Sequence, residues 1–143
     1  MLTYKHETPP LESIREFFYR TDKEFDVPLS QKVNVDEYTF KLYMHAEFFV
    51  CYDDNKIIGM ICCYMNRPPE AYISHVCVDS EHQGKGIFKE LFTLVKKECF
   101  IKSIGMISLE VNKNNYNAQQ IYKKLGFVDS NKTEHSTYMK LDL

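Results

Sequence analysis

The sequence has 143 residues and a formal net charge of −2, with 44% hydrophobic and 27% charged residues. This length predicts a single domain over residues 1–143, and the composition is that of an ordinary globular protein. We expect no nucleic-acid partner, because no lysine or arginine run marks a phosphate-backbone site, and no membrane partner, because no apolar run reaches the ~20 residues that span a bilayer.

The first ten residues, MLTYKHETPP, lack the apolar stretch of a signal peptide, so we expect a cytoplasmic protein. Five cysteines in apolar contexts, an odd number, favour free thiols. The sequence contains neither C-x-x-C nor H-x-x-x-H spacing, and we therefore expect no metal. The cysteines are Cys51, Cys62, Cys63, Cys77 and Cys99.

The first half of the chain predicts a short strand at residues 1–5, two helices and three further strands. TPPLESIREFFYRTD predicts a helix with Thr8 as N-cap and Pro9 at the first helical position. KEFDVPLSQ predicts a loop, and VDEYTFKLYMH predicts a helix that carries Val35, Tyr38 and Leu42 on one face. EFFVCYD, KIIGMICCYM and AYISHVCVD are apolar runs separated by turn signals, which predicts an antiparallel meander.

Helical periodicity returns from Gly86 to about residue 103, and GMISLEV follows as a predicted strand. A further helix presents Ala118, Ile121, Tyr122 and Leu125 on one face and ends at Gly126, before the strands FVDS and STYMKLDL. A strand–helix–strand unit with a helix of this length indicates a parallel crossover. The predicted fold class is therefore a mixed α/β sheet of about six to seven strands, antiparallel first and parallel at its centre, with about four helices.

The stretch EHQGKGIFKELF, residues 81–92, places two of the five glycines where a predicted helix begins. The first N–H groups of a helix lack intrahelical partners and carry partial positive charge, so a phosphate can bind them. Gly84 and Gly86 leave room for that approach and Lys85 adds a cation; the alternative is a loop that only requires positive φ. The stretch matches neither G-x-x-x-x-G-K-[ST] nor G-x-G-x-x-G, which disfavours a Walker or dinucleotide site.

VCVDSEHQGKGIFKELF resembles motif A of the GNAT superfamily of acyl-CoA-dependent N-acyltransferases, which reads Gln/Arg-x-x-Gly-x-Gly/Ala. LEVNKNNYNAQQIYKKLGF is similar to the second signature of the family, with its Asn at Asn115, its helical Tyr at Tyr122 and its Leu-Gly-Phe at residues 125–127. The two segments occur in the order of the family, and the resemblance covers nearly the whole chain. It implies a GNAT-like fold with helices on both faces of the sheet.

Phe88 departs from the motif, because the family has Gly or Ala at that position. A large ring there either crowds the coenzyme or points into the core beside Phe92, one helical turn further on. We expect the second arrangement, because Gly84 and Gly86 keep the closest approach open.

The resemblance implies acetyl-CoA as co-substrate, held between residues 74–78 and 106–111, which splay apart in the family. Backbone groups around Val76, Cys77 and Val78 would pair with the pantetheine arm, and an N–H there would polarise the thioester carbonyl. Asn115 would hold the splayed strand or the pantetheine, unless it is only an N-cap. The pyrophosphate would be held by Gln83, Gly84, Lys85, Gly86, Ile87 and Phe88.

The implied reaction is direct attack by a primary amine in a ternary complex, and the amine must be neutral. A lysine-like amine has a pKa of about 10.4, so a general base or a water relay to one would help. Glu110 is the first candidate, on the strand where some relatives keep a catalytic Glu; a solvated strand charge is the alternative. His75 is the second, unless it is a satisfied, half-buried histidine. Tyr122 occupies the family's position for the acid that protonates the leaving thiolate, with core packing as its alternative.

The acceptor amine is unidentified and would enter near residues 21–32 and the C-terminal strands. Asp22, Glu24 and Asp26 would attract a cationic amine there, or form a solvated loop. Cys77 would lie near the thioester, where packing is favoured over a covalent acyl-cysteine route. STYMKLDL is a candidate for pairing across a homodimer.

Three functions are compatible with these patterns. The main hypothesis is an acetyl-CoA-dependent N-acetyltransferase, which keeps both Asn115 and Tyr122. A non-catalytic acyl-CoA-binding or regulatory module on the same fold is the alternative, and Phe88 is its best support. A nucleotide-phosphate enzyme is the third, and the absence of a Lys-Ser/Thr pair speaks against it.

Overall fold

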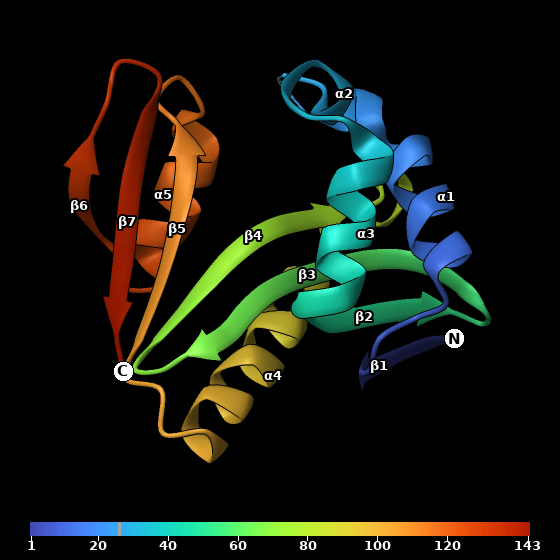
Figure 1. Ribbon diagram of the computed structural model, residues 1–143, viewed down its shortest axis with the longest axis horizontal. Helices are drawn as coiled ribbons and strands as arrows, with labels where there is room; N and C mark the ends of the chain where they lie inside the picture. Colours follow the sequence, from blue (N-terminus) through green and yellow to red (C-terminus); the bar gives the residue numbers. More distant parts are fainter. Residues whose placement is uncertain (26) are drawn as a thin grey trace.

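The structure is a computed structural model that describes residues 1–25 and 27–143. Within these residues one seven-stranded sheet has the strand order β1-β2-β3-β4-β5-β7-β6 (Figure 1). The strands are β1 (Leu2–His6), β2 (Glu47–Asp53), β3 (Lys56–Arg67), β4 (Glu70–Val78), β5 (Met106–Asn112), β6 (Val128–Lys132) and β7 (Ser136–Asp142). The α-helices are α1 (Leu11–Thr21), α2 (Leu29–Lys32), α3 (Val35–His45), α4 (Ile87–Ile101) and α5 (Tyr116–Lys124), with short 3-10 turns η1 (Asp22–Glu24) and η2 (Ser80–His82). The predicted mixed α/β fold is confirmed.

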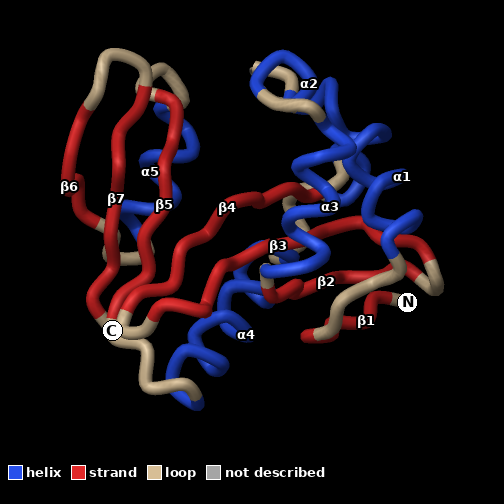
Figure 2. Tube along the Cα trace, in the orientation of Figure 1, coloured by secondary structure: helices blue, strands red, loops and turns tan. Residues whose placement is uncertain are grey.

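The centre of the sheet is its only parallel junction within the described residues. β1 to β4 form the predicted antiparallel meander, and β5 pairs antiparallel with β7. β4 and β5 pair in parallel from Glu70↔Met106 to Ile73↔Leu109. Beyond that point the two strands diverge, as Figures 1 and 2 show. The fold therefore opens a gap between the C-terminal halves of β4 and β5.

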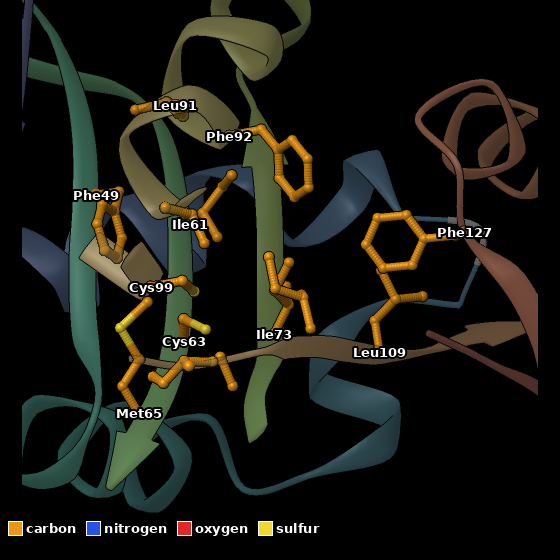
Figure 3. Packing of buried hydrophobic residues seen from close by; sticks show 14 of the residues in the cluster. Phe49, Ile61, Cys63, Met65, Ile73, Leu91, Phe92, Cys99, Leu109 and Phe127 are labelled. Carbon is orange, nitrogen blue, oxygen red and sulfur yellow. The ribbon is translucent and has the colours of Figure 1, made fainter. Parts of the chain in front are cut away.

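The helices cover the sheet on both faces, as expected from the resemblance. α1 and α3 pack on one face, where Ile14, Phe18 and Leu42 join buried side chains of β2 and β3. α4 packs on the other face, and Figure 3 shows Leu91 and Phe92 against the strands. No helix in residues 1–25 or 27–143 is long and apolar enough to cross a membrane.

Two local predictions in the N-terminal third are wrong. α1 begins at Leu11, with Pro10 as its N-cap, and not at Pro9 after a Thr8 cap. The cause is the Pro9-Pro10 pair, because a residue that precedes proline is kept out of the helical region. The predicted loop after α1 also contains one turn of helix, α2, which follows Pro28 and buries Leu29.

The cysteines are buried and free, as expected. The described residues also contain one group of metal-ligand chemistry, in which His6 Nε2 lies 2.7 Å from Glu47 Oε1 and His6 Nδ1 lies 3.7 Å from Glu98 Oε1. Lys102 Nζ already pairs with both carboxylates, at 3.4 Å and 3.7 Å. This arrangement is an ion-pair network that ties β1 and β2 to the end of α4.

Candidate active site

The gap between β4 and β5 continues into a pocket of about 820 Å³. This volume lies in the range of small-molecule and cofactor sites. The gap reaches from the N-terminal end of α4, past α5, to the segment between α1 and α3 on the other face of the sheet. It is therefore long enough to bring two substrates together from opposite faces.

A β-bulge at Ser74 sets the direction of the second half of β4. His75 pairs with Cys62 and Ile73 pairs with Cys63, so Ser74 is an extra residue opposite β3. An extra residue reverses the alternation of side chains along a strand. Beyond the bulge, Val76 packs on the α4 side and Cys77 on the α1 and α3 side.

The bulge also decides which backbone groups face the gap. The Asp79 N–H donates to the Ile58 carbonyl at 2.8 Å, so these two residues form a hydrogen-bonded pair of the β3–β4 ladder. In an antiparallel ladder such pairs alternate with pairs whose backbone groups point away from the partner strand. Val76 and Val78 belong to the second kind, so their N–H and C=O groups point away from β3. The Gln83 side-chain amide donates to the Val78 carbonyl at 3.2 Å. The backbone groups of Val76 and Val78 thus point into the gap, where the resemblance predicts contacts with a pantetheine arm.

Cys77 is turned away from the gap, which corrects the expectation that its thiol lies near the thioester. Its side chain packs in the core with α1, and it is not among the described residues that line the pocket. Burial raises the pKa of the Cys77 thiol to about 12. A thiol with this pKa carries almost no thiolate at neutral pH, so the geometry gives no support to a covalent acyl-cysteine route.

The glycine loop and the start of α4 form an open anion site. Gly84 and Gly86 have φ of +81° and +76°, and a Cβ atom built on either would meet nothing within 4 Å. Gly86 is the N-cap of α4, and no described side chain caps the helix in its place. Gly84 and Gly86 line the pocket, whereas Lys85 is exposed and is not among the lining residues found. The loop needs positive φ and also leaves the helical N–H groups free for an anion.

Ile87 and Phe88 contribute differently to this loop. The Ile87 side chain is buried in the core, so only its backbone is available to an anion. The Phe88 ring stacks on Phe92 with a centroid distance of 5.8 Å, as expected, and its edge meets Tyr122 at 6.1 Å. Phe88 therefore points toward the core and forms part of the pocket wall beside Tyr122.

Tyr122 and Asn115 both belong to α5. Tyr122 lines the pocket and packs edge-on against Phe127 at 5.5 Å, while burial raises its pKa to about 12. Asn115 is the N-cap of α5, because its Oδ1 accepts the Ala118 N–H at 3.1 Å. Asn115 thus starts the helix that presents Tyr122 to the gap, and it also lines the pocket.

Glu110 is exposed on β5, opposite Tyr138 of β7. It alternates with the buried Leu109 and Val111, so its carboxylate lies on the opposite face of the sheet from the α4 core. Glu110 lines the pocket. The pKa of Tyr72 is raised, mainly by burial and also by the nearby charge of Glu110. The gap therefore has a tyrosine on its α5 side and a carboxylate on the other.

Asp22 and Glu24, in the segment after α1, do not line the pocket. Asp22 accepts hydrogen bonds from the Ser30 N–H at 2.9 Å and from Ser30 Oγ at 2.7 Å, and so pins α2. Glu24 accepts from the Ser80 N–H at 3.1 Å. Neither is among the described lining residues, so the geometry gives no support to the alternative in which they attract a cationic amine; Asp26 lies outside the described residues. The segment instead lines the pocket with Phe25, Val27, Leu29, Lys32 and Val33.

His75 is buried under α1 and α3. Its ring lies 4.3 Å from that of Phe18 and 5.4 Å from that of Phe25, between centroids. Burial, with a smaller effect of Lys32, lowers its pKa to about 3. Its Nε2 atom finds no hydrogen-bond partner among the residues that the structure describes. His75 is therefore a neutral imidazole at physiological pH and a weak base.

The low pKa of His75 predicts a loss of stability in mild acid. The histidine has a pKa of about 6.5 in the unfolded chain, so between that value and about 3 the unfolded state binds more protons. We expect the contribution of neutral His75 to the free energy of unfolding to be complete above pH 6.5. Below pH 6.5 this contribution should decline by up to ~1.4 kcal/mol per pH unit. Denaturant unfolding at pH 7, 6 and 5 should show this decline, and His75→Gln should remove it. His135→Gln, at an exposed site, should keep it; an equal slope in His75→Gln would contradict the assignment.

Comparisons with known proteins bear on the family and the fold of the chain. Residues 11–127 match the profile of the family described as "Acetyltransferase (GNAT) family". The N-alpha-acetyltransferase MAK3 of Arabidopsis thaliana is 26% identical over 114 residues, which cover 77% of this chain and 60% of that protein. This chain therefore matches less than two thirds of the length of that relative.

Solved structures share the fold at low sequence identity. Ard1 from Thermoplasma volcanium superposes with a TM-score of 0.84 at 20% identity, over 99% of this chain and 97% of that chain. PaiA N-acetyltransferase from Thermoplasma acidophilum, solved in complex with coenzyme A, superposes with a TM-score of 0.76 at 15% identity, over 99% of both chains. These likenesses show that the fold of the chain is shared with both proteins.

Proposed function

The chain belongs to the acetyltransferase (GNAT) family, and we propose that it transfers an acetyl group from acetyl-CoA to a primary amine in a ternary complex. The observation that carries the proposal is the gap between β4 and β5, which has an open anion site at one end and Tyr122 and Glu110 on its two sides. The second half of β4 directs the backbone groups of Val76 and Val78 into the gap between them. Each feature serves a different part of the reaction.

The phosphate end of acetyl-CoA would bind the loop of residues 83–88. The N–H groups at the start of α4 and the helix dipole favour a pyrophosphate, and the two glycines let it approach the backbone. The pantetheine arm would then follow β4 and pair with Val76 and Val78, much as an added strand would. A backbone N–H in this segment would polarise the thioester carbonyl.

Acyl transfer forms a bond between the amine nitrogen and the thioester carbon and breaks the bond between that carbon and sulfur. We assign Glu110 to accept the proton that the amine loses, directly or through water, because it lines the gap on the side away from Tyr122. His75 is the weaker candidate, because its low pKa leaves little drive to accept a proton. The proton accepted by Glu110 returns to solvent after each turnover.

Tyr122 would act on the leaving sulfur. Its pKa of about 12 keeps the hydroxyl protonated across the physiological range, so it can donate to the sulfur as negative charge develops. A thiol has a pKa of about 8.5, so hydrogen-bond donation to the departing thiolate is favoured over complete proton transfer. Solvent then supplies the proton of the free thiol.

The acceptor that best fits the site is the α-amine of a polypeptide. An α-amine has a pKa of about 7.7 to 8.0, so roughly one in ten is already neutral at pH 7, whereas only about one lysine-like amine in a thousand is. Among the described residues, the pocket lining carries the Glu110 carboxylate together with Lys32 and Lys89, a charge balance that disfavours a polycationic amine. The Arabidopsis relative is named as an N-alpha-acetyltransferase.

A peptide panel tests the proposal. The purified chain is mixed with acetyl-CoA and three acceptors: a peptide with a free α-amine and no lysine, the same peptide with a blocked α-amine and one added lysine, and spermidine. We expect thiol release and a mass increase of one acetyl group with the first peptide, and much slower reaction with the others. Turnover of the lysine peptide or spermidine alone would overturn the α-amine assignment. Acetyl-CoA binding without any transfer would instead support a non-catalytic module.

Glu110→Gln tests the base. The substitution keeps the shape of the side chain and removes its ability to take a proton, so we expect kcat/KM at pH 7 to fall ~10- to 100-fold. The deficit should shrink toward pH 9, because the α-amine then loses its proton to solvent. Glu134→Gln, an exposed position outside the pocket lining, is the matched control. A pH profile of Glu110→Gln parallel to that of the parent would rule out Glu110 as the base.

A further inference from the structure

Tyr38 of α3 reaches across to the bulge in β4. Its hydroxyl donates to the Ser74 carbonyl at 3.0 Å and lies 3.1 Å from Ser74 Oγ. The same oxygen lies 3.4 Å from His75 Nδ1. The Tyr38 ring packs against Phe18 at 6.0 Å and against His75 at 5.9 Å. One hydroxyl group therefore meets both residues at the bulge.

The Ser74 carbonyl needs such a partner. Ser74 is the extra residue of the bulge, so the ladder with β3 does not pair it in the regular way. A backbone carbonyl inside a protein must be satisfied by some donor, because an unpaired one costs the free energy of a lost hydrogen bond. Tyr38 provides that donor from a helix that is packed on the opposite side of the strand from α4.

The bulge lies where the cofactor gap begins. Ile73↔Leu109 is the last pair between β4 and β5, and Ser74 is the next residue of β4. The backbone groups of Val76 and Val78 face the gap only because the bulge fixes the alternation beyond it. A slip of one residue would exchange the two faces of the strand and direct these groups elsewhere.

We propose that Tyr38 is a positioning residue for acyl transfer: its hydroxyl holds the Ser74 bulge and thereby fixes the direction in which Val76 and Val78 present their backbone to the thioester. The inference rests on the proposed function. Binding and positioning are then carried out by different parts of the site. The glycine loop binds the phosphates, and the Tyr38–Ser74 contact sets the position of the reacting carbonyl.

Tyr38→Phe tests the inference, since it removes one oxygen and keeps the ring. We expect kcat to fall ~10- to 100-fold, because a small misplacement of the carbonyl weakens its alignment with the amine and with the polarising N–H. The dissociation constant of CoA, which the loop of residues 83–88 dominates, should change by less than ~3-fold. Ser74→Ala removes only the Oγ contact and should lower kcat less, and the double variant should be no slower than Tyr38→Phe.

Tyr43→Phe is the matched control. Tyr43 lies on the same helix and packs at the edge of the same core cluster, but it is not among the described pocket residues. The kcat of Tyr43→Phe should therefore equal that of the parent. A parental kcat in Tyr38→Phe, or equal losses of kcat and CoA affinity, would overturn the proposal. If Tyr38→Phe does not fold, as judged by circular dichroism, Tyr38→Met takes its place, because methionine also lacks the hydroxyl, and a parental kcat in the folded Tyr38→Met variant would overturn the proposal.

The parent protein is assayed in parallel to keep the two hypotheses apart. If the parent binds acetyl-CoA and turns over, and Tyr38→Phe keeps the parental kcat, only the role of Tyr38 is contradicted. A parent that neither binds acetyl-CoA nor releases thiol contradicts the proposed function, and the role of Tyr38 is then rejected with it.

Discussion

Replacement of Gly86 by Asp is expected to weaken acetyl-CoA binding by at least ~100-fold. Gly86 is the N-cap of α4 at a φ of +76°, and a side chain there would project into open space in front of the first helical N–H groups. An aspartate would place its own carboxylate in that space, so it would compete for the same donors and repel the pyrophosphate. Calorimetric titration of the parent and of the variant with acetyl-CoA measures the change.

Gly86→Asn is the control that separates charge from backbone strain. Asn and Asp have the same shape, and both tolerate positive φ better than other residues with a side chain. We therefore expect Gly86→Asn to bind acetyl-CoA more weakly than the parent but at least ~10-fold more tightly than Gly86→Asp. Equal affinities for the two variants would show that no anion lies close to this position and would contradict the pyrophosphate assignment.

Tyr122→Phe is expected to lower kcat ~100-fold and to leave the KM for acetyl-CoA nearly unchanged. The variant keeps the ring that packs against Phe88 and Phe127, and it removes only the hydroxyl that would stabilise the leaving thiolate. The loss corresponds to about 2.7 kcal/mol of transition-state stabilisation. Steady-state thiol release at saturating acceptor gives both constants.

The pH dependence of the parent adds a second check on Tyr122. The pKa of about 12 keeps its hydroxyl protonated, so the rate should not decline through loss of this proton between pH 7 and 10. Tyr116→Phe, on the exposed side of the same helix, should retain the parental kcat. A kcat of Tyr122→Phe within threefold of the parent would reduce Tyr122 to a packing residue.

The sequence predicts most of the fold because its local signals agree with the final packing. The apolar runs at residues 47–53 and 56–65 and the periodic face of Val35, Tyr38 and Leu42 correspond to β2, β3 and α3 of the structure. The glycines of the loop after β4 could also be read correctly, since positive φ and an open helix start are local properties. The position of Phe88 against Phe92 follows from helical spacing alone.

The features that sequence reasoning missed depend on non-local contacts. No local signal marks the bulge at Ser74, which forms because β3 and Tyr38 accommodate one extra residue. Simple alternation along β4 therefore fails beyond it, and with it the expectation that the Cys77 thiol is near the thioester. The burial of His75 likewise depends on aromatic rings from α1, α3 and the segment that follows α1.

Asp22 and Glu24 are a third case in which the contacts are non-local. Asp22 and Glu24 are bound to the backbone N–H groups of Ser30 and Ser80, and only the folded chain brings these groups together. The sequence shows the charges but not the donors that already use them. An apolar pattern that could have pointed to the pocket wall is the alternation of Phe25, Val27 and Leu29 in the same segment.

A crystal structure of the chain with acetyl-CoA tests the central claim most directly, because it locates both ends of the co-substrate. We predict that the pyrophosphate contacts the backbone N–H groups of residues 84–88 and that the thioester lies between β4 and β5, with its carbonyl toward the backbone of Val76–Val78 and its sulfur toward Tyr122. Acetyl-CoA bound outside the gap, or an empty gap in crystals grown at saturating acetyl-CoA, would contradict it.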